Sequence, residues 1–505
     1  MAPSPFGCTA LLAGVLALLT VDRVGRAEEP PTSRARTPTT AAPAAPAAPT
    51  RRAAGQEAGG PRVRMPLETF ALSNGLRVVL QEDHGAPTVA ITVVYLAGRQ
   101  QDPPGAPGMT AIVARLLEHA STRHVARGQR ASILGAVGAP TWQVVFPGEL
   151  DRTLVTQAVP REALELALWF ESDRMGFLLD GVTQGAVEAE HAALLEVARD
   201  PKKRKVDDEL MEALFGAGHP YGPRSLSEMP PREAEVRAHV QRHYQPANAF
   251  LVLSGDFVAA EARALVKRYF ETLPSGPRPP QRAPMMPGPR KQSAPLRIAA
   301  GIEAPVVVVS WPTPEFLADD DVVCDVMASV LEARLGKRLK GTPKVLLRVG
   351  AQQRSNQLAS AFSVYAAVAP GRSVEEAQRV LEEEVERMKA SEATEAEMRQ
   401  ARFDLLRHTA DRAEDVHGRA VQIASFVAQN GRADFLEHYL ASYQAMAPAA
   451  LRRVAQQYLT AERRLVAVLE PTAGAAPGPD LNEGFVAMAR GEVAGRRDAA
   501  GAGAG

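Results

Sequence analysis

The feature that most constrains the fold is a pattern that occurs twice. In each copy a helix-like segment ends in a tyrosine, a short turn follows, and an apolar strand-like segment comes next, in VQRHYQPANAFLVLSGD (240–256) and LRRVAQQYLTAERRLVAVLEP (451–471). Tyr244 and Tyr458 are 214 residues apart (458 − 244), about the size of one domain. Because other segments also follow in a similar order, the sequence predicts a duplicated domain.

Periodicity predicts mixed elements in each copy. Asn74-Gly75 between two apolar runs is typical of a hairpin. Further strands are expected at 89–95, 249–253, 306–311 and 361–368, and helices at 108–119, 161–177, 232–244, 320–331, 373–390 and 395–421. We therefore expect an α+β fold of two homologous domains, each a mainly antiparallel sheet with helices packed on one face.

The flanking segments differ in composition from these two regions. The apolar run Ala10–Thr20 and the small-residue site Gly25-Arg26-Ala27 predict an export signal, with an uncleaved membrane tether as the alternative. The predicted order is a signal peptide (1–27), a disordered Ala/Pro-rich tether (28–65), an N-terminal domain (66–275), a Pro-rich linker (276–295), a C-terminal domain (296–472) and a flexible tail (473–505). We expect an exported protein of the periplasm or cell envelope.

Charge and cysteine content exclude some classes of protein. Lys plus Arg equal Asp plus Glu at 58 each, so no global positive field indicates a nucleic-acid partner. Without the signal peptide only Cys324 remains, which excludes an intrachain disulfide.

Five short motifs occur in a fixed order. They are Leu72–Val78 (LSNGLRV), Ala97–Gly105 (AGRQQDPPG), Gly218–Gly222 (GHPYG), His243–Asn248 (HYQPAN) and Gly255-Asp256. In this order and spacing the chain resembles one half of a pitrilysin/insulinase-type zinc peptidase, over about residues 66–472. The resemblance implies two such domains joined by a linker, and a peptide-holding chamber formed by two of these halves.

The resemblance also implies where a zinc site would lie. In the family, two histidines of H-x-x-E-H and a glutamate roughly 75 residues downstream hold the zinc. One alignment uses Glu118-His119, so that Arg115 replaces the first histidine and Glu196 is the downstream ligand. A second alignment, which we prefer, starts from Gly108-Met109-Thr110 and places the motif at Ala111, Ala114 and Arg115, with Glu190 downstream.

Both alignments place Arg115 where a histidine is needed. A guanidinium stays charged near neutral pH and repels a metal ion, so we predict a degenerate site without zinc or another cofactor, whose remnant is Arg115, Glu118, His119 and Glu190. An alternative zinc site could use His119, Glu188, His191 and Glu196, which crowd the same helices.

Two further groups of residues were considered. The family's second domain supplies an arginine and a tyrosine that hold substrate, and the looser alignment places Lys340 and Leu347 there, so Lys340 is a weak candidate for substrate binding. His239 and His243 stand four apart on a predicted helix, but no carboxylate is suitably placed, and we interpret them as surface histidines.

These observations favour a metallopeptidase homologue that lacks an intact H-x-x-E-H motif and is not active alone. We predict a non-catalytic subunit whose partners are a catalytic homologue with intact zinc ligands and a peptide or unfolded-protein substrate. The alternatives are a structural scaffold on the same fold and an active metalloendopeptidase with rearranged ligands.

Overall fold

The computed structural model describes residues 66–139, 141–145, 150–199, 206–222, 226–290, 294–341, 344–433 and 435–472. The predicted signal peptide, tether and tail lie outside these residues. The described residues all belong to one compact unit, and the boundaries at the 276–295 linker stay a prediction.

The first half contains a six-stranded sheet of order β1-β2-β6-β3-β5-β4. Strands β2 and β6 run parallel, and the other neighbours run antiparallel. Its elements are β1 (Glu68–Ala71), β2 (Arg77–Glu82), β3 (Thr88–Tyr95), α1 (Met109–His119), α2 (Gln129–Ala136), β4 (Thr141–Val145), β5 (Thr153–Pro160), α3 (Leu164–Phe177), α4 (Gln184–Arg199), α5 (Val206–Phe215), α6 (Glu233–His243), β6 (Ala249–Gly255) and α7 (Ala259–Phe270).

The second half contains a five-stranded sheet of order β7-β11-β8-β10-β9. Strands β7 and β11 run parallel, and the other neighbours run antiparallel. Its elements are β7 (Leu296–Ala300), β8 (Val306–Thr313), α8 (Asp319–Arg338), β9 (Leu346–Arg354), β10 (Ser360–Val368), α9 (Val374–Ala390), α10 (Glu395–Arg412), α11 (Val416–Asn430), α12 (Phe435–Ala445), α13 (Pro448–Tyr458) and β11 (Leu465–Pro471).

The two halves follow one plan. The chain order β2, β3, α1, β4, β5, α3, α4, α5, α6, β6 corresponds to β7, β8, α8, β9, β10, α9, α10, α11, α13, β11, and the corresponding strands take the same places in their sheets. The predicted fold class, two homologous α+β domains with mainly antiparallel sheets, is confirmed.

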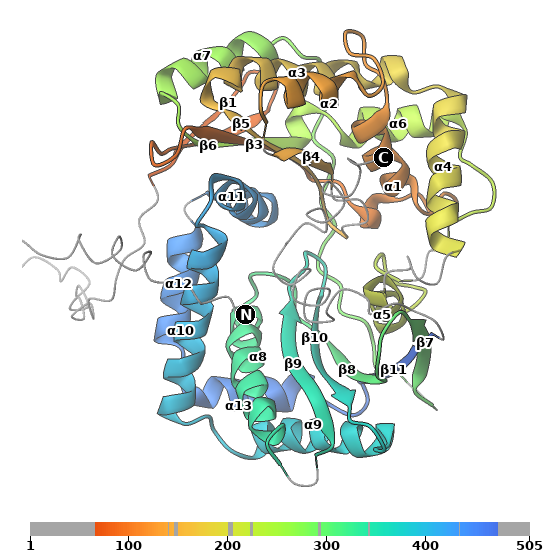
Figure 1. Ribbon diagram of the computed structural model, residues 1–505, viewed down its shortest axis with the longest axis vertical. Helices are drawn as coiled ribbons and strands as arrows, with labels where there is room; N and C mark the ends of the chain where they lie inside the picture. Colours follow the sequence, from red (N-terminus) through yellow and green to blue (C-terminus); the bar gives the residue numbers. More distant parts are fainter. Residues whose placement is uncertain are drawn as a thin grey trace, which may run out of the picture. The chain divides into compact units, whose positions relative to one another are not determined.

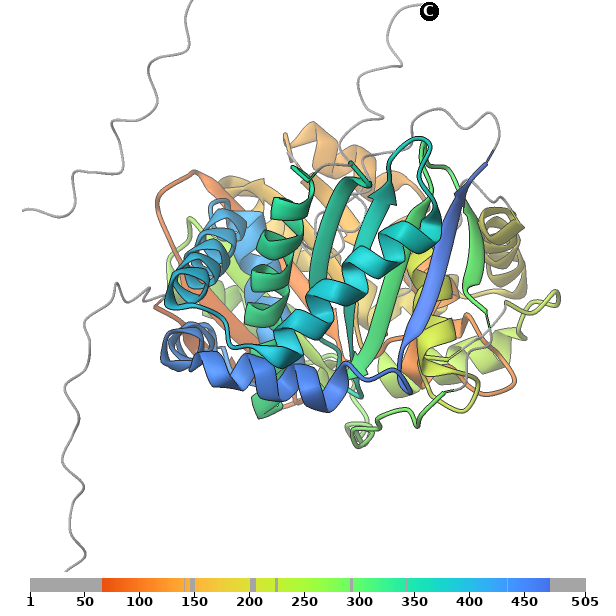
Figure 2. The ribbon, with the colours of Figure 1, turned by 90° about the horizontal axis from the view of Figure 1, so that it is seen from below.

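Successive side chains along each strand point to opposite faces of the sheet, and both faces are buried. Val307, Val309 and Trp311 of β8 pack with α8, α9 and α13, which cover one face of the second sheet (Figure 2), whereas Val306 and Val308 face the opposite way. The first sheet packs in the same manner against α1, α3, α6 and α7.

In addition, one helix of each half packs on the sheet of the other half (Figure 1). Helix α11 of the second half lies on β3 and β6, where Ile423 and Val427 pack against Phe250 and Val252. Helix α5 of the first half packs on β8, β11 and β7. Because α5 and α11 are equivalent elements, this exchange is reciprocal, and it buries the second face of each sheet.

Two of the predicted helices differ from the structure: 395–421 is interrupted, and 320–331 was predicted too short. The expected helix 395–421 is two helices, because Asp415 accepts a hydrogen bond from the Gly418 N–H (2.6 Å) and begins α11 anew. Helix α10 packs on α8, whereas α11 turns to the first sheet. The helix expected at 320–331 runs from 319 to 338. Within the described residues, no helix combines the length and apolar character needed to cross a membrane.

Candidate functional site

Helix α1 carries the remnant of the metal motif, and a buried carboxylate fixes its start. Asp102 accepts hydrogen bonds from the backbone N–H groups of Gly108 (2.8 Å) and Thr110 (2.8 Å) and from the Thr110 hydroxyl (2.6 Å). This satisfies donors of the first turn. Ile112 and Leu116 are buried in the first core, so α1 is held firmly beneath the side chains that face α4.

Glu190 of α4 is the centre of this site. Its residue is only 3% exposed. Its Oε2 atom accepts a hydrogen bond from Arg115 Nε (2.8 Å) and lies 3.2 Å from His119 Nδ1. Arg127 Nη2 donates to Oε1 (3.2 Å). The structure therefore brings Arg115, His119 and Glu190 together, and Arg115 and Glu190 are the pair that the second alignment places at metal positions.

This group of side chains does not fit zinc. A zinc ligand must offer an unprotonated donor atom, and here only His119 and Glu190 can do so. Arg115 offers a permanent cation at hydrogen-bonding distance from the one carboxylate. Ala111 and Ala114 offer no donor atom. The arrangement supports ion pairing between the two helices.

Of the four alternative zinc ligands, His191 and Glu188 make other contacts. His191 Nε2 lies 2.8 Å from the carbonyl oxygen of Ser227. Glu188 accepts from Gln184 Nε2 (3.0 Å) on the exposed side of α4, and Glu196 is also exposed. Across the described residues, no three His, Cys, Asp or Glu side chains are grouped so that they could hold a metal ion. Glu118 lies only near His119 Nε2, at 3.9 Å.

The residues aligned with the family's substrate clamp lie after α8. Lys340 is exposed, and Leu347 on β9 is 38% exposed. Arg334 of α8, in contrast, is buried and makes two hydrogen bonds to the Glu397 carboxylate of α10 (2.8 and 2.9 Å). These bonds, with burial acting in the opposite direction, leave the pKa of Glu397 at about 2. Sequence reasoning missed this pair, and it missed Arg127, which lies in a loop without any motif.

The interpretation of His239 and His243 as surface histidines was wrong. They are 6% and 9% exposed, and their rings lie 4.7 Å apart. Burial lowers the pKa of His239 to about 3 and that of His243 to about 4. Helical spacing alone could not reveal this, because their burial depends on how α6 packs in the first half.

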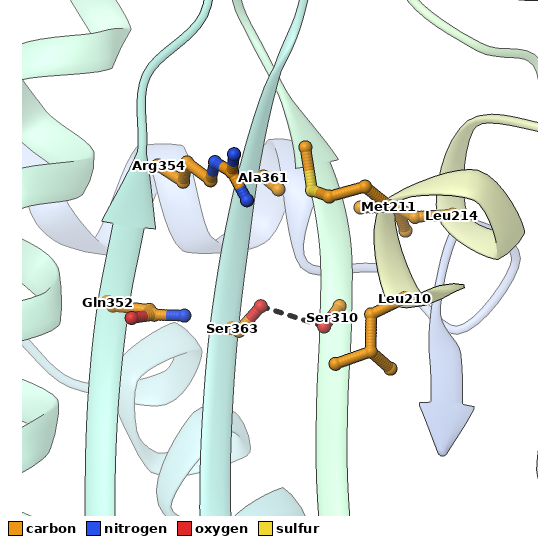
Figure 3. A pocket seen from close by; sticks show the side chains of 8 residues that line it. All are labelled: Leu210, Met211, Leu214, Ser310, Gln352, Arg354, Ala361 and Ser363. Carbon is orange, nitrogen blue, oxygen red and sulfur yellow. Dashed lines mark hydrogen bonds between the residues drawn. The ribbon is translucent and has the colours of Figure 1, made fainter. Parts of the chain in front are cut away.

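A hollow lies on the face of the second sheet that α5 partly covers (Figure 3). Polar side chains of the strands form its floor, and Ser310 and Ser363 hydrogen-bond to each other there (2.7 Å). Helix α5 forms an apolar wall. The lining residues are Leu210, Met211, Leu214, Ser310, Gln352, Arg354, Ala361 and Ser363. Most of these side chains are buried, so the hollow is a small space in the packing between α5 and the sheet.

Comparison with known proteins identifies relatives over most of the chain. Residues 233–405, from α6 into α10, match the family described as "Peptidase M16 inactive domain". The zinc protease PqqE of Helicobacter pylori is 22% identical over 428 residues, which are 80% of this chain and 93% of that protein.

Two solved structures show the same fold. The first is a protease from Helicobacter pylori, with a TM-score of 0.70 and 20% identity, covering 81% of this chain and 100% of that one. The second is the periplasmic protease PqqL from Escherichia coli, with a TM-score of 0.64 and 15% identity. The match covers 86% of this chain but only 51% of PqqL.

Proposed function

Because this chain is a member of the M16 (pitrilysin) peptidase family, we propose that it is a non-catalytic subunit. It forms half of a peptide-holding chamber, and a homologue with an intact H-x-x-E-H motif forms the other half and carries the zinc. The observation that carries this proposal is the ion pair of Arg115 with Glu190, because it puts a cation where the family alignment expects metal ligands.

The relatives support a paired arrangement. This chain corresponds to about half of PqqL, so a second half is available within that longer protein, and a separate subunit would supply it here. The description of PqqL as periplasmic agrees with the export signal that we expect at residues 1–27. We propose the periplasm or cell envelope as the place of action.

The substrate is a peptide or an unfolded protein segment. Lys340 offers an exposed positive charge that can contact such a segment. Balanced charge over the whole chain gives no electrostatic reason to expect nucleic acid.

Metal analysis of the purified chain tests the non-catalytic role. We expect no stoichiometric zinc and no cleavage in a broad peptide-library assay. One zinc per chain that is lost in His119→Ala would contradict the proposal, and its further loss in Glu188→Ala or Glu196→Ala would favour the rearranged zinc site.

Co-expression tests the partnership. With a homologue that carries intact zinc ligands we expect a heterodimer with peptidase activity. The interface should be largely polar and of modest strength, because aromatic residues, which act as buried anchors, are only 5% of the chain. A chain that stays monomeric beside every such homologue, in sedimentation at micromolar concentration, would favour the scaffold function instead.

A further inference from the structure

We propose that two aspartates of α8, Asp321 and Asp325, hold helix α12 in place in a proton-dependent way. While this acid pair keeps a proton, α12 stays docked on α8. When both carboxyl groups are ionised, α12 loosens, together with its contact to α11. The inference concerns a conformational change within the second half and does not depend on a metal, a partner subunit or a substrate.

The first evidence is the way in which α12 is attached to α8. The Tyr443 hydroxyl donates a hydrogen bond to Asp325 Oδ2 (3.0 Å), and the Tyr439 hydroxyl donates to the same oxygen. The two tyrosine rings lie 4.9 Å apart, and Tyr443 is only 3% exposed. One carboxyl oxygen of α8 therefore holds two side chains of α12.

The second evidence is the position of the other carboxyl group. Asp321 lies one helical turn before Asp325 and is fully buried, at 0% exposed. It accepts hydrogen bonds from the Ser355 hydroxyl (2.7 Å), from Gln353 Nε2 (3.0 Å) and from the Leu317 N–H (3.3 Å). Leu317 has a φ of 74°, a left-handed backbone that a leucine rarely adopts. Asp321 therefore holds the turn before α8 and the end of β9 against the helix.

The third evidence is the charge around the acid pair. The hydroxyl and amide donors that contact the two carboxyl groups are all neutral. Arg453 of α13 pairs with Asp320 at the start of α8. Burial raises the pKa of both Asp321 and Asp325, and the charge of Asp321 raises the pKa of Asp325 further. The folded chain therefore keeps a proton at a pH where the unfolded chain has lost it.

Other titratable groups near α8 do not release this proton. Burial raises the pKa values of Tyr439, Tyr443 and Cys324 well above their ordinary values, so these groups stay protonated. Arg354 of β9 faces α5 on the other side of the sheet. The remaining charged groups on the elements around α8 are Glu315 before the helix, Glu397 of α10 with Arg334, Glu383 and Glu384 of α9 with Arg338, and Arg402 of α10, which donates to the carbonyl oxygens of Tyr443 and Met446.

Tyr439 extends the contact of the acid pair towards the first half. Its ring lies 5.6 Å from Phe426 of α11 and 6.2 Å from Phe316 in the turn before α8. Helix α11 packs on the first sheet through Ile423 and Val427. Ionisation of the acid pair should therefore weaken the packing of α11 on the first sheet as well as that of α12 on α8.

The sign of the pH effect follows from the raised pKa values. A carboxyl group whose pKa is higher in the folded chain stabilises the fold in acid, and this stability is lost as pH rises through the folded-state pKa. Helix α12 should therefore be held more tightly at about pH 5 than at about pH 8.

Hydrogen exchange of the full chain, followed by mass spectrometry and corrected for the intrinsic effect of pH, tests the proposal. We expect the amides of α12 to exchange at least about tenfold faster at about pH 8 than at about pH 5, while those of α13 stay protected. Asp325→Asn keeps a hydrogen-bond acceptor but cannot ionise, so it should remove most of this change. Asp319→Asn, which alters an exposed carboxylate of the same helix, should keep it. Corrected exchange of α12 that is equal at both pH values, or a change that persists in full in Asp325→Asn, would overturn the proposal.

A second measurement keeps the proposal testable if Asp325→Asn does not fold. The Tyr443 hydroxyl favours the ionised form of Asp325, so Tyr443→Phe should move the midpoint of the pH dependence of α12 exchange upward, by about half a pH unit or more. Tyr458→Phe, which removes a hydroxyl from Asp320, is the matched control and should leave the midpoint unchanged. Faster exchange of Tyr443→Phe at every pH without a shift of the midpoint would show a purely structural contact and refute the proton-dependent one.

Discussion

The two halves of the molecule each pair an arginine with a glutamate between two helices, and the two pairs differ in geometry and exposure. In each half, an arginine of the first helix of the shared plan meets a glutamate of the third, as α1 meets α4 and α8 meets α10. The second-half pair is bidentate and buried, with the Arg334 side chain 8% exposed. The first-half pair is more open, and His119 and Arg127 share it.

The comparison shows how each half supplies the positive charge that its buried glutamate requires. Both helix pairs need a cation to offset the glutamate that lies between them. The second half meets this need with one guanidinium alone. The first half meets it with three basic side chains around one carboxylate, an arrangement that keeps a donor suited to metal binding. In both halves an arginine therefore supplies the main cation at this helix pair.

The exchanged helices give the largest expected effect. Ile423→Ala on α11 should lower the free energy of unfolding by about 3 kcal/mol, because it leaves a cavity against the first sheet. Leu214→Ala on α5 should cost a similar amount against the second sheet. Denaturant unfolding of each variant checks this, with Val421→Ala on the partly buried side of α11 as the control.

If the exchange couples the halves, each variant should still unfold in a single transition. Separate transitions, in which Ile423→Ala destabilises one half alone, would contradict the idea that the exchanged helices couple the stability of the two halves.

The two ion pairs should differ in strength. Arg334→Met should lower the free energy of unfolding by about 3 kcal/mol, since it leaves the largely buried Glu397 carboxylate without its cation. Arg115→Met should cost less, because His119 and Arg127 still face Glu190. Equilibrium unfolding at neutral pH checks the order, and Arg334→Met/Glu397→Gln should recover part of the loss. An equal or larger cost for Arg115→Met would reverse the comparison.

The sequence predicted the duplication well, because alternation and helical spacing report burial directly. Strand β3, the hairpin at Asn74-Gly75 and the end of α6 at Tyr244 were all visible in this way. The break at Asp415 was missed, because apolar spacing continues through it although the two helices pack on different sheets.

The candidate site was predicted only in part, for a similar reason. The family spacing placed Glu190 opposite Arg115, and the structure has this contact. The contribution of Arg127 and the burial of His239 depend on how loops and helices pack against one another. No local pattern encodes such contacts.

Acid sensitivity should distinguish the halves. Helix α6 of the first half carries the buried His239 and His243, whereas the corresponding helix α13 of the second half carries no histidine. Below about pH 6.5 the unfolded chain binds a proton that buried His239, with a pKa of about 3, does not accept. Stability contributed by neutral His239 is therefore lost as pH falls from about 6.5 towards 3. His239→Val should remove a cost of about 2 kcal/mol at pH 5.

The measurement is the difference in unfolding free energy between His239→Val and the wild type at pH 7.5 and pH 5. A difference is needed because burial raises the pKa values of Asp321 and Asp325, so these groups stabilise the folded state as pH falls. They are present in both proteins and cancel. A difference that does not change with pH would mean that His239 is protonated in the folded chain.

The smallest expected effect concerns the ends of the two equivalent helices α1 and α8. Helix α1 ends at His119 beside Glu190, whereas α8 ends at Arg338 and is followed by the exposed Lys340. In the heterodimer that we propose, Lys340→Ala should raise KM about threefold with little change in kcat, because an exposed charge pair contributes well under about 1 kcal/mol. Tm should not change. Lys337→Ala, which removes an exposed charge within α8, is the matched control. Equal KM values for the two variants would remove Lys340 from the proposed substrate surface.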